Sequence, residues 1–485
     1  MPSVLLTHSY FLYLDPKQEE AGNAYPPIGT LYAASCLKEM GYEVSLFDSM
    51  LAKSPNELLP RLQETQPDFL VVYDDGFNYL TKMCLTNMRE AAFEMIHMAK
   101  AKGIPVIISS SDSTDHFEKY LDQGADFVIL GEGERTLTDL LLVLQDGADP
   151  ETIQGIAWRK NKQTINAGKR PVMRDLDTLP LPAWEMVDFE AYRNLWISKA
   201  GYFSINMVTT RGCTYKCNWC AKPIFGNRYN ARTPGHVVEE LKFLIKEKNV
   251  DHIWFCDDIF GLKPGWLIEF ARLVTEAGLQ FRFKIQSRAD LMVVESSVKA
   301  LAEAGCDTVW LGAESGSQKI LDAMEKGITL PQIYDSRRLL KQSGIKTAFF
   351  LQFGYPGENM EDIQSTIQMV LETMPDEIGI SVTYPLPGTK LYEKVKSQLS
   401  EKSNWKDSDE LAMMFQNTFA EGFYKELQRY MHTRYRLQKG ILAIRKGMRK
   451  PGGITYASMR SAILVAFHLP MAILKKRKLM SFKPL

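Results

Sequence analysis

The sequence predicts an α/β fold with an N-terminal doubly wound parallel sheet, a partial (β/α)6 barrel and a helical C-terminal region. Two observations support this fold class. Short apolar runs alternate with amphipathic stretches of helical length up to about residue 395, and the pattern beyond it is mostly helical. At 485 residues the chain is also too long for a single hydrophobic core. Strands that alternate with helices form right-handed βαβ units around parallel sheets.

The first predicted domain, residues 1–150, contains five strand candidates and the helical stretches between them. The strands are expected at residues 4–7, 43–47, 69–73, 105–109 and 127–130, and the helices at 29–40, 57–64, 86–102, 115–122 and 136–145. The strand candidates are apolar almost throughout, which is typical of strands buried on both faces. In a doubly wound sheet the ligand is expected beyond the C-terminal ends of the strands.

A linker is predicted at residues 151–200, with a small hairpin near 156–166 and an extended, proline-rich connector at 179–182. Residues 201–395 then hold six further strand candidates, at 204–209, 252–256, 282–286, 308–311, 347–353 and 378–383. Six βα units can close into part of a (β/α)8 barrel, and such barrels carry their chemistry on the loops that follow the strands. Residues 396–485 are expected to be helical.

The charge of the chain is balanced overall but not along its length. Lys and Arg number 58, as do Asp and Glu, yet no acidic residue follows Glu426 and fourteen basic residues lie between Arg429 and Lys483. A basic tail on an acidic body predicts an anionic partner for the tail. No aromatic-rich basic module is recognisable, so nucleic acid is not expected as that partner.

The apolar segment 461–474 precedes four consecutive basic residues, Lys475 to Lys478. It is too short to span a bilayer, and no longer apolar run occurs. Two interpretations stay open: the segment lies at the inner face of a membrane, or it is a docked helix with a solvated charged end. The N-terminus lacks the features of a signal peptide, so a cytoplasmic location is expected, with peripheral membrane contact through the C-terminus.

Three cysteines crowd into one short segment directly after the first barrel strand: Cys213, Cys217 and Cys220. Such spacing in a chain with an odd number of cysteines indicates a metal site and not a disulfide framework. Three thiolates can bind three corners of a [4Fe–4S] cluster and leave the fourth iron open. A zinc site and three unrelated buried thiols are the alternatives.

The Cys-x3-Cys-x2-Cys pattern, with the aromatic Trp219 before its last cysteine, resembles the signature of the radical S-adenosylmethionine (SAM) superfamily. The resemblance implies that SAM binds the open iron through its amino and carboxylate groups and is cleaved reductively to a 5′-deoxyadenosyl radical. It also implies an external electron donor, such as flavodoxin or ferredoxin. Trp219 is expected to pack beside the cluster.

Polar residues at the ends of the next three strands are the expected SAM contacts. Asp257 and Asp258 could pair with the SAM ammonium group, although either could instead cap a turn. Gln286 and Arg288 follow the third strand, where the guanidinium could bind the SAM carboxylate or form a surface salt bridge. Glu314 could accept hydrogen bonds from the ribose hydroxyls or belong to the N-cap region of the next helix.

Two segments of the first domain, 25–34 and 124–134, resemble the cobalamin-binding domain of class B radical SAM proteins. The similarity extends over roughly residues 1–395, and the loop 73–79 is expected to face the lower side of the corrin. The Asp-x-His-x-x-Gly motif is absent, so no histidine ligand on cobalt is expected; a degenerate domain without cofactor is the alternative. The resemblance implies cobalamin contacts at Ile28, Gly29, Asp75, Phe77, Ser109, Gly131, Glu132 and Gly133.

The resemblance therefore implies a cobalamin-dependent radical SAM enzyme that transfers a methyl group to an unactivated carbon of a small-molecule, lipid or natural-product substrate. One alternative uses the same cofactors for ring formation or oxidation, as in the anaerobic porphyrin-ester cyclases. Another is a non-catalytic cobalamin or redox sensor. The substrate cannot be named, because the loops and helices that would select it carry no transferable code.

Overall fold

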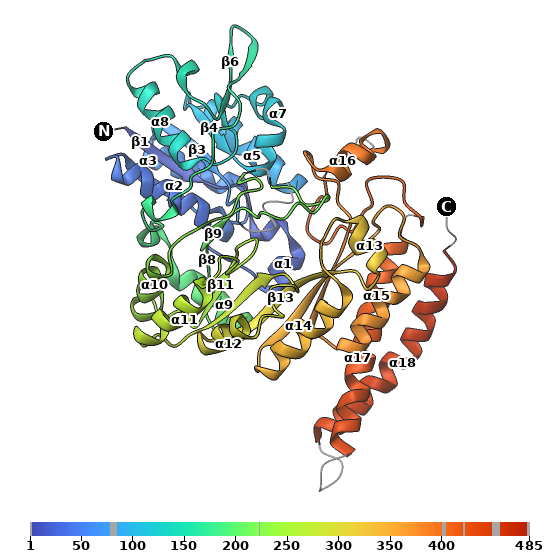
Figure 1. Cartoon of the computed structure of the whole chain (residues 1–485). Coiled ribbons are helices and arrows are strands. Elements are labelled where there is room, and N and C mark those ends of the chain that lie inside the picture. The colour runs from blue at the N-terminus through green and yellow to red at the C-terminus, as the bar shows by residue number, and fades with distance from the viewer. Residues whose placement is uncertain are drawn as a thin grey trace.

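The computed structural model of the chain describes residues 2–77, 85–222, 224–399, 404–420, 422–448 and 456–482. It shows two mostly parallel sheets in sequence, followed by a long helical hairpin (Figure 1). The predicted α/β fold class is thereby confirmed, including the helical C-terminal region. No helix in the described part of the chain is both long and apolar enough to cross a bilayer.

The first sheet has seven strands in the order β2-β1-β3-β4-β5-β6-β7. Its parallel strands are β1 (Ser3–Thr7), β2 (Glu43–Phe47), β3 (Phe69–Tyr73), β4 (Val106–Ser109) and β5 (Phe127–Ile129). Helices α3 (Leu58–Thr65), α5 (Thr86–Lys100) and α7 (Phe117–Asp122) cover one face, and α2 (Ile28–Glu39) and α8 (Glu134–Gln145) cover the other. Successive strand residues alternate between these two apolar cores, which makes the sheet doubly wound.

A hairpin extends the first sheet beyond residue 150, the limit predicted for the first domain. β6 (Ile156–Lys160) pairs antiparallel with β5, and β7 (Gln163–Asn166) pairs with β6. Asn161 and Lys162 both have positive φ, as a tight two-residue hairpin turn requires. Because an uncovered β5 would present unpaired backbone groups, the hairpin gives that strand a partner.

The second sheet is a partial barrel of six parallel strands in chain order. They are β8 (Ser204–Met207), β11 (His252–Phe255), β12 (Arg282–Ser287), β13 (Cys306–Glu314), β14 (Lys346–Phe353) and β15 (Glu377–Val382). The connecting helices are α10 (Pro234–Lys242), α11 (Trp266–Glu276), α12 (Glu295–Glu303), α13 (Gln318–Ala323), α14 (Leu330–Gln342) and α15 (Met360–Thr373). The end strands β8 and β15 do not pair, so the barrel stays open.

Two long antiparallel helices, α17 (Phe423–Met448) and α18 (Tyr456–Met480), close the described chain after the short α16 (Lys390–Val395). α17 packs against α15 and the end strand β15, and α18 packs on the outer side of α17 (Figure 1). The hydroxyl of Tyr435 on α17 donates hydrogen bonds to the carbonyls of Pro375 and Asp376, just before β15. The hairpin therefore lies along the open edge of the barrel.

Candidate functional site

The three cysteines lie in a loop whose two ends are fastened together. β9 (Thr210–Arg211) pairs antiparallel with β10 (Asn230–Ala231), so the loop leaves and returns at one point of the barrel's C-terminal edge. Gly212 begins the loop with φ +78°, and a Cβ at this position would lie 2.1 Å from the carbonyl oxygen of Arg228. Only glycine fits there. The thiols of Cys213, Cys217 and Cys220 are all free.

The chemistry of the three thiols suits metal binding. Burial raises the pKa of the Cys213 thiol, and burial together with the nearby Asp258 carboxylate raises the pKa of Cys220 to about 12. Such thiols are poor free nucleophiles, and a metal must displace their protons. No three His, Cys, Asp or Glu side chains of the described residues converge on one metal-ion position. A cubane cluster does not require this convergence, because each thiolate binds a different iron.

Two buried polar atoms near the cysteines lack a hydrogen-bond partner among the described residues. They are the indole Nε1 of Trp219, next to Cys220, and the Oγ of Ser287 at the end of β12. Buried donors and acceptors in native proteins are normally paired, so an orphaned atom calls for an explanation such as a bound group. The three thiols and these two atoms together fit a bound cluster and its ligand.

The two aspartates after β11 have different surroundings. Asp257 is fully buried, and its carboxylate accepts hydrogen bonds from the backbone N–H groups of Thr209 and Thr210 and from the Thr209 hydroxyl, at 2.5–2.8 Å. Burial raises the pKa of Asp257 to about 6. Asp257 therefore braces the entry to the cysteine loop. Asp258 is half-buried and acts electrostatically on Cys213 and Cys220. Contacts of either with SAM stay predictions.

Arg288 lies against the cysteine loop and already has an anionic partner. Its Nε and Nη2 donate to the two carboxylate oxygens of Asp290 at 2.9 and 3.2 Å, and its guanidinium lies 3.5 Å from the ring centroid of Tyr215. Nη1 approaches the Sγ of Cys217 at 4.0 Å. The neighbouring Gln286 is half-buried on β12. A SAM carboxylate would thus have to share Arg288 with Asp290.

Glu314 and Lys326 form a buried ion pair, with Nζ and Oε1 2.8 Å apart, beside the cysteine loop. Glu314 has φ +58°, a left-handed conformation that is strained for a non-glycine residue and that clusters at functional sites. Lys326 also lies over the ring of Trp219, 5.9 Å from its centroid. The sequence motif indicated Glu314 but gave no sign of its lysine partner.

The residues predicted to hold cobalamin lie at the C-terminal edge of the first sheet, where they pack closely. A Cβ on Gly29 would lie 3.2 Å from the Cα of Asp75, and one on Gly133 would lie 2.9 Å from the Oγ of Ser109 and 2.6 Å from the hydroxyl of Tyr73. The side chain of Asp75 caps the backbone N–H of Phe77 at 2.9 Å. Ile28 is completely buried at the start of α2.

This edge faces the outgoing part of the cysteine loop. The ring of Phe77 stacks on that of Phe225, with centroids 5.0 Å apart, and the backbone of Ile224 lies 3.5 Å from the Cβ position of Gly131. Only the first part of the predicted corrin-facing loop, residues 73–77, lies within the described chain. The residues predicted to bind cobalamin therefore contact the loop that carries the predicted cluster ligands.

Arg211, two residues before Cys213, joins the two domains and was not predicted. Its guanidinium pairs with Glu132 at 2.5 Å and with Glu134 at 2.7 Å, and all three side chains are buried. The rings of Tyr32, Phe77 and Phe225 surround it at 5.2–5.6 Å. Burial and the neighbouring Glu134 raise the pKa of the predicted cofactor ligand Glu132, although Arg211 opposes the shift. Glu132 thus holds the cysteine loop, and a contact with cobalamin stays a prediction.

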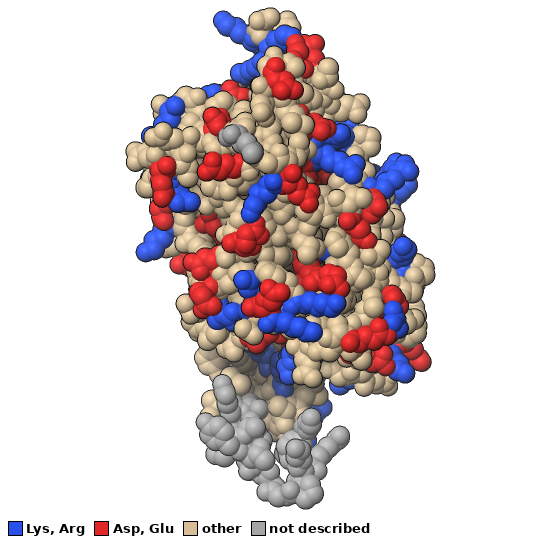
Figure 2. All heavy atoms as spheres, turned by 90° about the vertical axis from the view of Figure 1, so that its left-hand side faces the viewer, with Lys and Arg blue, Asp and Glu red and all other residues tan. Residues whose placement is uncertain are grey.

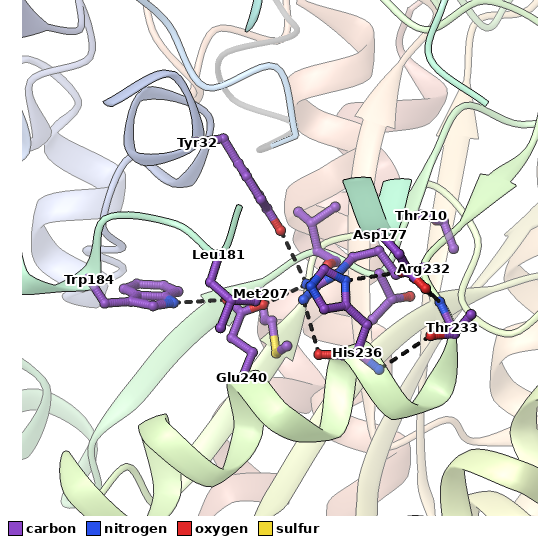
Figure 3. A network of polar contacts seen from close by, with 12 residues as sticks. Tyr32, Asp177, Leu181, Trp184, Met207, Thr210, Arg232, Thr233, His236 and Glu240 are labelled. Atoms are coloured by element: carbon purple, nitrogen blue, oxygen red, sulfur yellow. Dashed lines mark hydrogen bonds and ion pairs between the residues drawn. The ribbon is translucent and has the colours of Figure 1, made fainter. Parts of the chain in front are cut away.

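A second buried network joins the same two domains through Arg232, just after β10 (Figure 3). Arg232 donates to the hydroxyl of Tyr32 on α2 at 3.1 Å and pairs with Glu240 on α10 at 2.5 Å. Trp184 of the predicted linker donates to the other oxygen of Glu240 at 2.9 Å. Nothing in the local sequence pattern indicates these contacts, because each joins residues that are distant in the chain.

Glu358, in the loop after β14, is a buried carboxyl that the sequence motifs did not single out. One oxygen accepts the backbone N–H of Gly354 at 2.6 Å, and the other has no partner among the described residues. Burial raises the pKa of Glu358 to about 8, so the group is mostly neutral at pH 7. A neutral carboxyl at the barrel mouth can donate a hydrogen bond.

Comparison with protein-family models matches residues 207–370 to the radical SAM superfamily. An uncharacterized methyltransferase of Pyrococcus horikoshii is 27% identical over 395 residues, which cover 79% of this chain and 82% of the relative. The anaerobic magnesium-protoporphyrin IX monomethyl ester cyclase of Cereibacter sphaeroides is 25% identical, covering 78% and 62%. The hopanoid C-3 methylase of Methylococcus capsulatus is 23% identical, covering 93% and 82%.

Two solved structures share the fold. One is the radical SAM methyltransferase TsrM from Kitasatospora setae with cobalamin and a [4Fe–4S] cluster bound, with a TM-score of 0.68 and 20% identity, covering 82% of this chain and 75% of that one. The other is the cobalamin-dependent SAM radical enzyme OxsB with aqua-cobalamin bound, with a TM-score of 0.72 and 16% identity, covering 99% and 76%. At these identities the likeness is one of fold.

Proposed function

We propose that this chain, in which residues 207–370 form a radical SAM domain within the fold of cobalamin-dependent radical SAM enzymes, transfers a methyl group to an unactivated carbon. The observation that carries the radical chemistry is the fastened loop with three free thiols at the C-terminal edge of the barrel, and the choice of a methyl group rests on the relatives. The names of the relatives point the same way, since several of them are methyltransferases or methylases.

Cys213, Cys217 and Cys220 would hold the cluster, whose chemistry when bound is the reductive cleavage of SAM. The chain's own residues would orient SAM around it. Asp258 offers a carboxylate to an ammonium group, and the buried pair of Glu314 and Lys326 offers both a hydrogen-bond acceptor and a donor. Asp257 acts as a positioning residue, because its hydrogen bonds fix the first backbone groups of the loop.

Cobalamin is proposed to bind at the C-terminal edge of the first sheet, where it would supply the methyl group when bound. Gly76 and Gly131 present their backbone to Ile224 of the cysteine loop without a side chain between them, so a flat ring could approach there if that residue moved. In the present structure Ile224 and Phe225 pack over Gly76, Phe77 and Gly131. Binding of cobalamin therefore requires this segment to move. A tryptophan introduced by Phe225→Trp would report the movement through its intrinsic fluorescence, even without turnover.

The experiment that tests the function is anaerobic reconstitution with iron, sulfide and cobalamin, followed by reduction with dithionite or flavodoxin in the presence of methyl-labelled SAM. Methyl transfer predicts 5′-deoxyadenosine together with label in the protein-bound cobalamin fraction. Formation of 5′-deoxyadenosine without any label transfer would contradict methyl transfer. The absence of SAM cleavage in a protein with a full cluster spectrum would favour a non-catalytic sensor instead.

Ring formation or oxidation is the second candidate, favoured by the similarity to the cyclase of Cereibacter sphaeroides. It uses the same loop and the same barrel edge, and it predicts that the methyl label leaves in the methionine released when SAM is cleaved. The substrate is proposed to be a small molecule or a lipid. TsrM has been solved with tryptophan as its substrate, and a relative that matches 93% of this chain is named as a methylase of hopanoids.

A further inference from the structure

The outermost helix, α18, carries an unusual number of exposed apolar side chains. Of the large apolar side chains exposed in the described structure, seven lie on this helix. The most exposed are Ile463 at 71%, Phe467 at 62% and Leu474 at 58%. Extended apolar patches on soluble proteins mark surfaces that contact something other than water. The apolar face of α18 is defined here by Ile463, Leu464, Phe467, Leu469, Ile473 and Leu474.

An ordinary surface helix buries one apolar stripe and exposes polar residues, whereas α18 buries Ala472 and Leu479 and still exposes a wide apolar face. His468 is buried on the side of α17, and the half-buried Lys475 donates from Nζ to the hydroxyl of Thr433 on α17 at 2.9 Å. Lys478 pairs with Glu426 of α17 at 2.9 Å. Polar contacts and the buried side chains of Ala472 and Leu479 thus hold the helix to the protein, and its remaining large apolar side chains point outward.

Charge distinguishes this face from the rest of the surface. Figure 2 shows another face of the molecule, on which Lys and Arg side chains lie intermixed with Asp and Glu. Beyond Glu426, in contrast, the sequence has fourteen basic residues and no acidic one. Lys476 and Arg477 are exposed and form no ion pair or hydrogen bond with the described residues. An apolar face that ends in unpaired cations matches the headgroup region of an anionic bilayer.

The basic end of α18 lies on the side of the barrel where the strands end. The ring of Phe482, just after α18, packs on Phe423 at the start of α17, with centroids 5.8 Å apart. Directly before α17, the hydroxyl of Thr418 donates to the carbonyl of Glu358 in the loop after β14. The hairpin thus connects the cationic end of α18 to the C-terminal edge of the barrel, the edge that carries the cysteine loop.

We propose that α18 seats the protein on an anionic lipid surface, with its apolar face in the interface and Lys476 and Arg477 at the lipid phosphates. The geometry is that of a helix lying on the membrane, because no helix in the described part of the chain can span it. The inference deepens the proposed function by bringing the barrel edge close to amphiphilic substrates. It does not depend on the cofactors, so it can fail or hold independently of the radical chemistry.

The test is flotation of the full-length protein with vesicles of phosphatidylcholine alone and of phosphatidylcholine mixed with phosphatidylglycerol. We expect binding to the mixed vesicles, weakened by added salt, and little binding to the neutral ones. The double variant Phe467→Ser with Leu474→Ser should reduce binding at least about tenfold, because it removes two exposed apolar side chains that the lipid interface would bury. Lys476→Gln with Arg477→Gln should reduce it about tenfold or more, since each basic residue near such a surface adds about 1 kcal/mol.

Ile268→Ser is the matched control, because Ile268 on α11 is 56% exposed but lies outside the hairpin. It should leave vesicle binding unchanged. A second copy of the chain is the competing occupant of the apolar face. Absence of flotation would overturn the proposal. So would a dimer, detected by analytical ultracentrifugation, that the Phe467→Ser, Leu474→Ser variant dissociates while its binding to vesicles stays unchanged. Formation of 5′-deoxyadenosine by the reconstituted enzyme without vesicles would remain a separate measure of the proposed function.

Discussion

The C-terminal edges of the two sheets use their side chains in different ways. At the barrel edge the charged groups are paired with one another, as Arg288 is with Asp290 and Glu314 with Lys326, while the cysteine thiols remain free. At the edge of the first sheet, glycines and aromatic rings pack against the cysteine loop itself. The comparison shows that the barrel edge keeps unpaired thiols, which suits the proposed ligand, whereas the described part of the other edge packs against the cysteine loop.

The largest effect should come from the thiols. Cys217→Ser should abolish the iron–sulfur absorption after reconstitution and reduce 5′-deoxyadenosine formation to background, because two thiolates cannot hold three corners of the cluster. Far-ultraviolet circular dichroism should be unchanged, since the loop is fastened by backbone pairing between β9 and β10. Cys306→Ala, which removes a thiol at the N-terminal end of β13, is the control and should keep the cluster, because the cysteine loop lies at the opposite edge of the barrel. A cluster of normal intensity in Cys217→Ser would contradict the assignment.

The next largest effect should come from Arg211, which joins the two edges. Arg211→Ala leaves Glu132 and Glu134 buried without their cation, and removal of one partner of a buried pair costs about 3–5 kcal/mol. We expect a strongly lowered midpoint of thermal unfolding for the two-domain body.

Arg159→Ala provides the comparison for Arg211, because its ion pair with Asp122 is exposed. It should cost about 1 kcal/mol or less. If the two alanine variants melt at the same temperature, Arg211 does not join the domains as described.

A smaller effect is expected at Gly133. The Cβ of Gly133→Ala would lie within 3 Å of Tyr73 and Ser109, and such overpacking costs about 1–3 kcal/mol. Gly235→Ala, in the first turn of α10 with no atom near its Cβ position, should be neutral or slightly stabilising. Chemical denaturation measures both. A Gly133→Ala protein of full stability but with lost cobalamin binding would show that this glycine serves the cofactor and not the packing.

The last predicted effect is a change in the pH dependence of stability at Glu358. Its pKa is about 8 in the folded protein and is near the ordinary value of 4.5 when unfolded, because burial disfavours the carboxylate. Between these values the unfolded state binds fewer protons, so stability falls with rising pH by up to about 1.4 kcal/mol per pH unit. Glu358→Gln lacks this titration and can keep the contact with Gly354.

The measurement is the difference in melting temperature between Glu358→Gln and the wild type from pH 5 to pH 8, the range set by the two pKa values. The melting temperature of the variant should increase relative to that of the wild type as the pH rises. A difference that stays constant over this range would show that Glu358 is already ionised in the folded protein.

The sequence predicted the elements of both sheets and the cysteine loop because these depend on local patterns: alternating apolar runs and the spacing of three residue types. It could not predict that Asp257 binds the backbone of Thr209 and Thr210, or that Glu132 pairs with Arg211. Both contacts join segments that are far apart in the chain, so no local pattern encodes them. Polar residues at strand ends were predicted as ligand contacts; two of them, Asp257 and Glu132, also hold the loop in place, and their ligand contacts stay predictions.

The pairing of β9 with β10 has a consequence for how the metal centre is assembled. The β9–β10 pair fixes both ends of the loop, and Asp257 braces its entry. Folding of the chain therefore already supplies most of the entropy cost of loop closure, before iron binds. Loading of the cluster is thereby separated from folding. Under the proposed function, we therefore expect the apoprotein to accept iron and sulfide without first unfolding, so that a lost cluster can be rebuilt on the same chain.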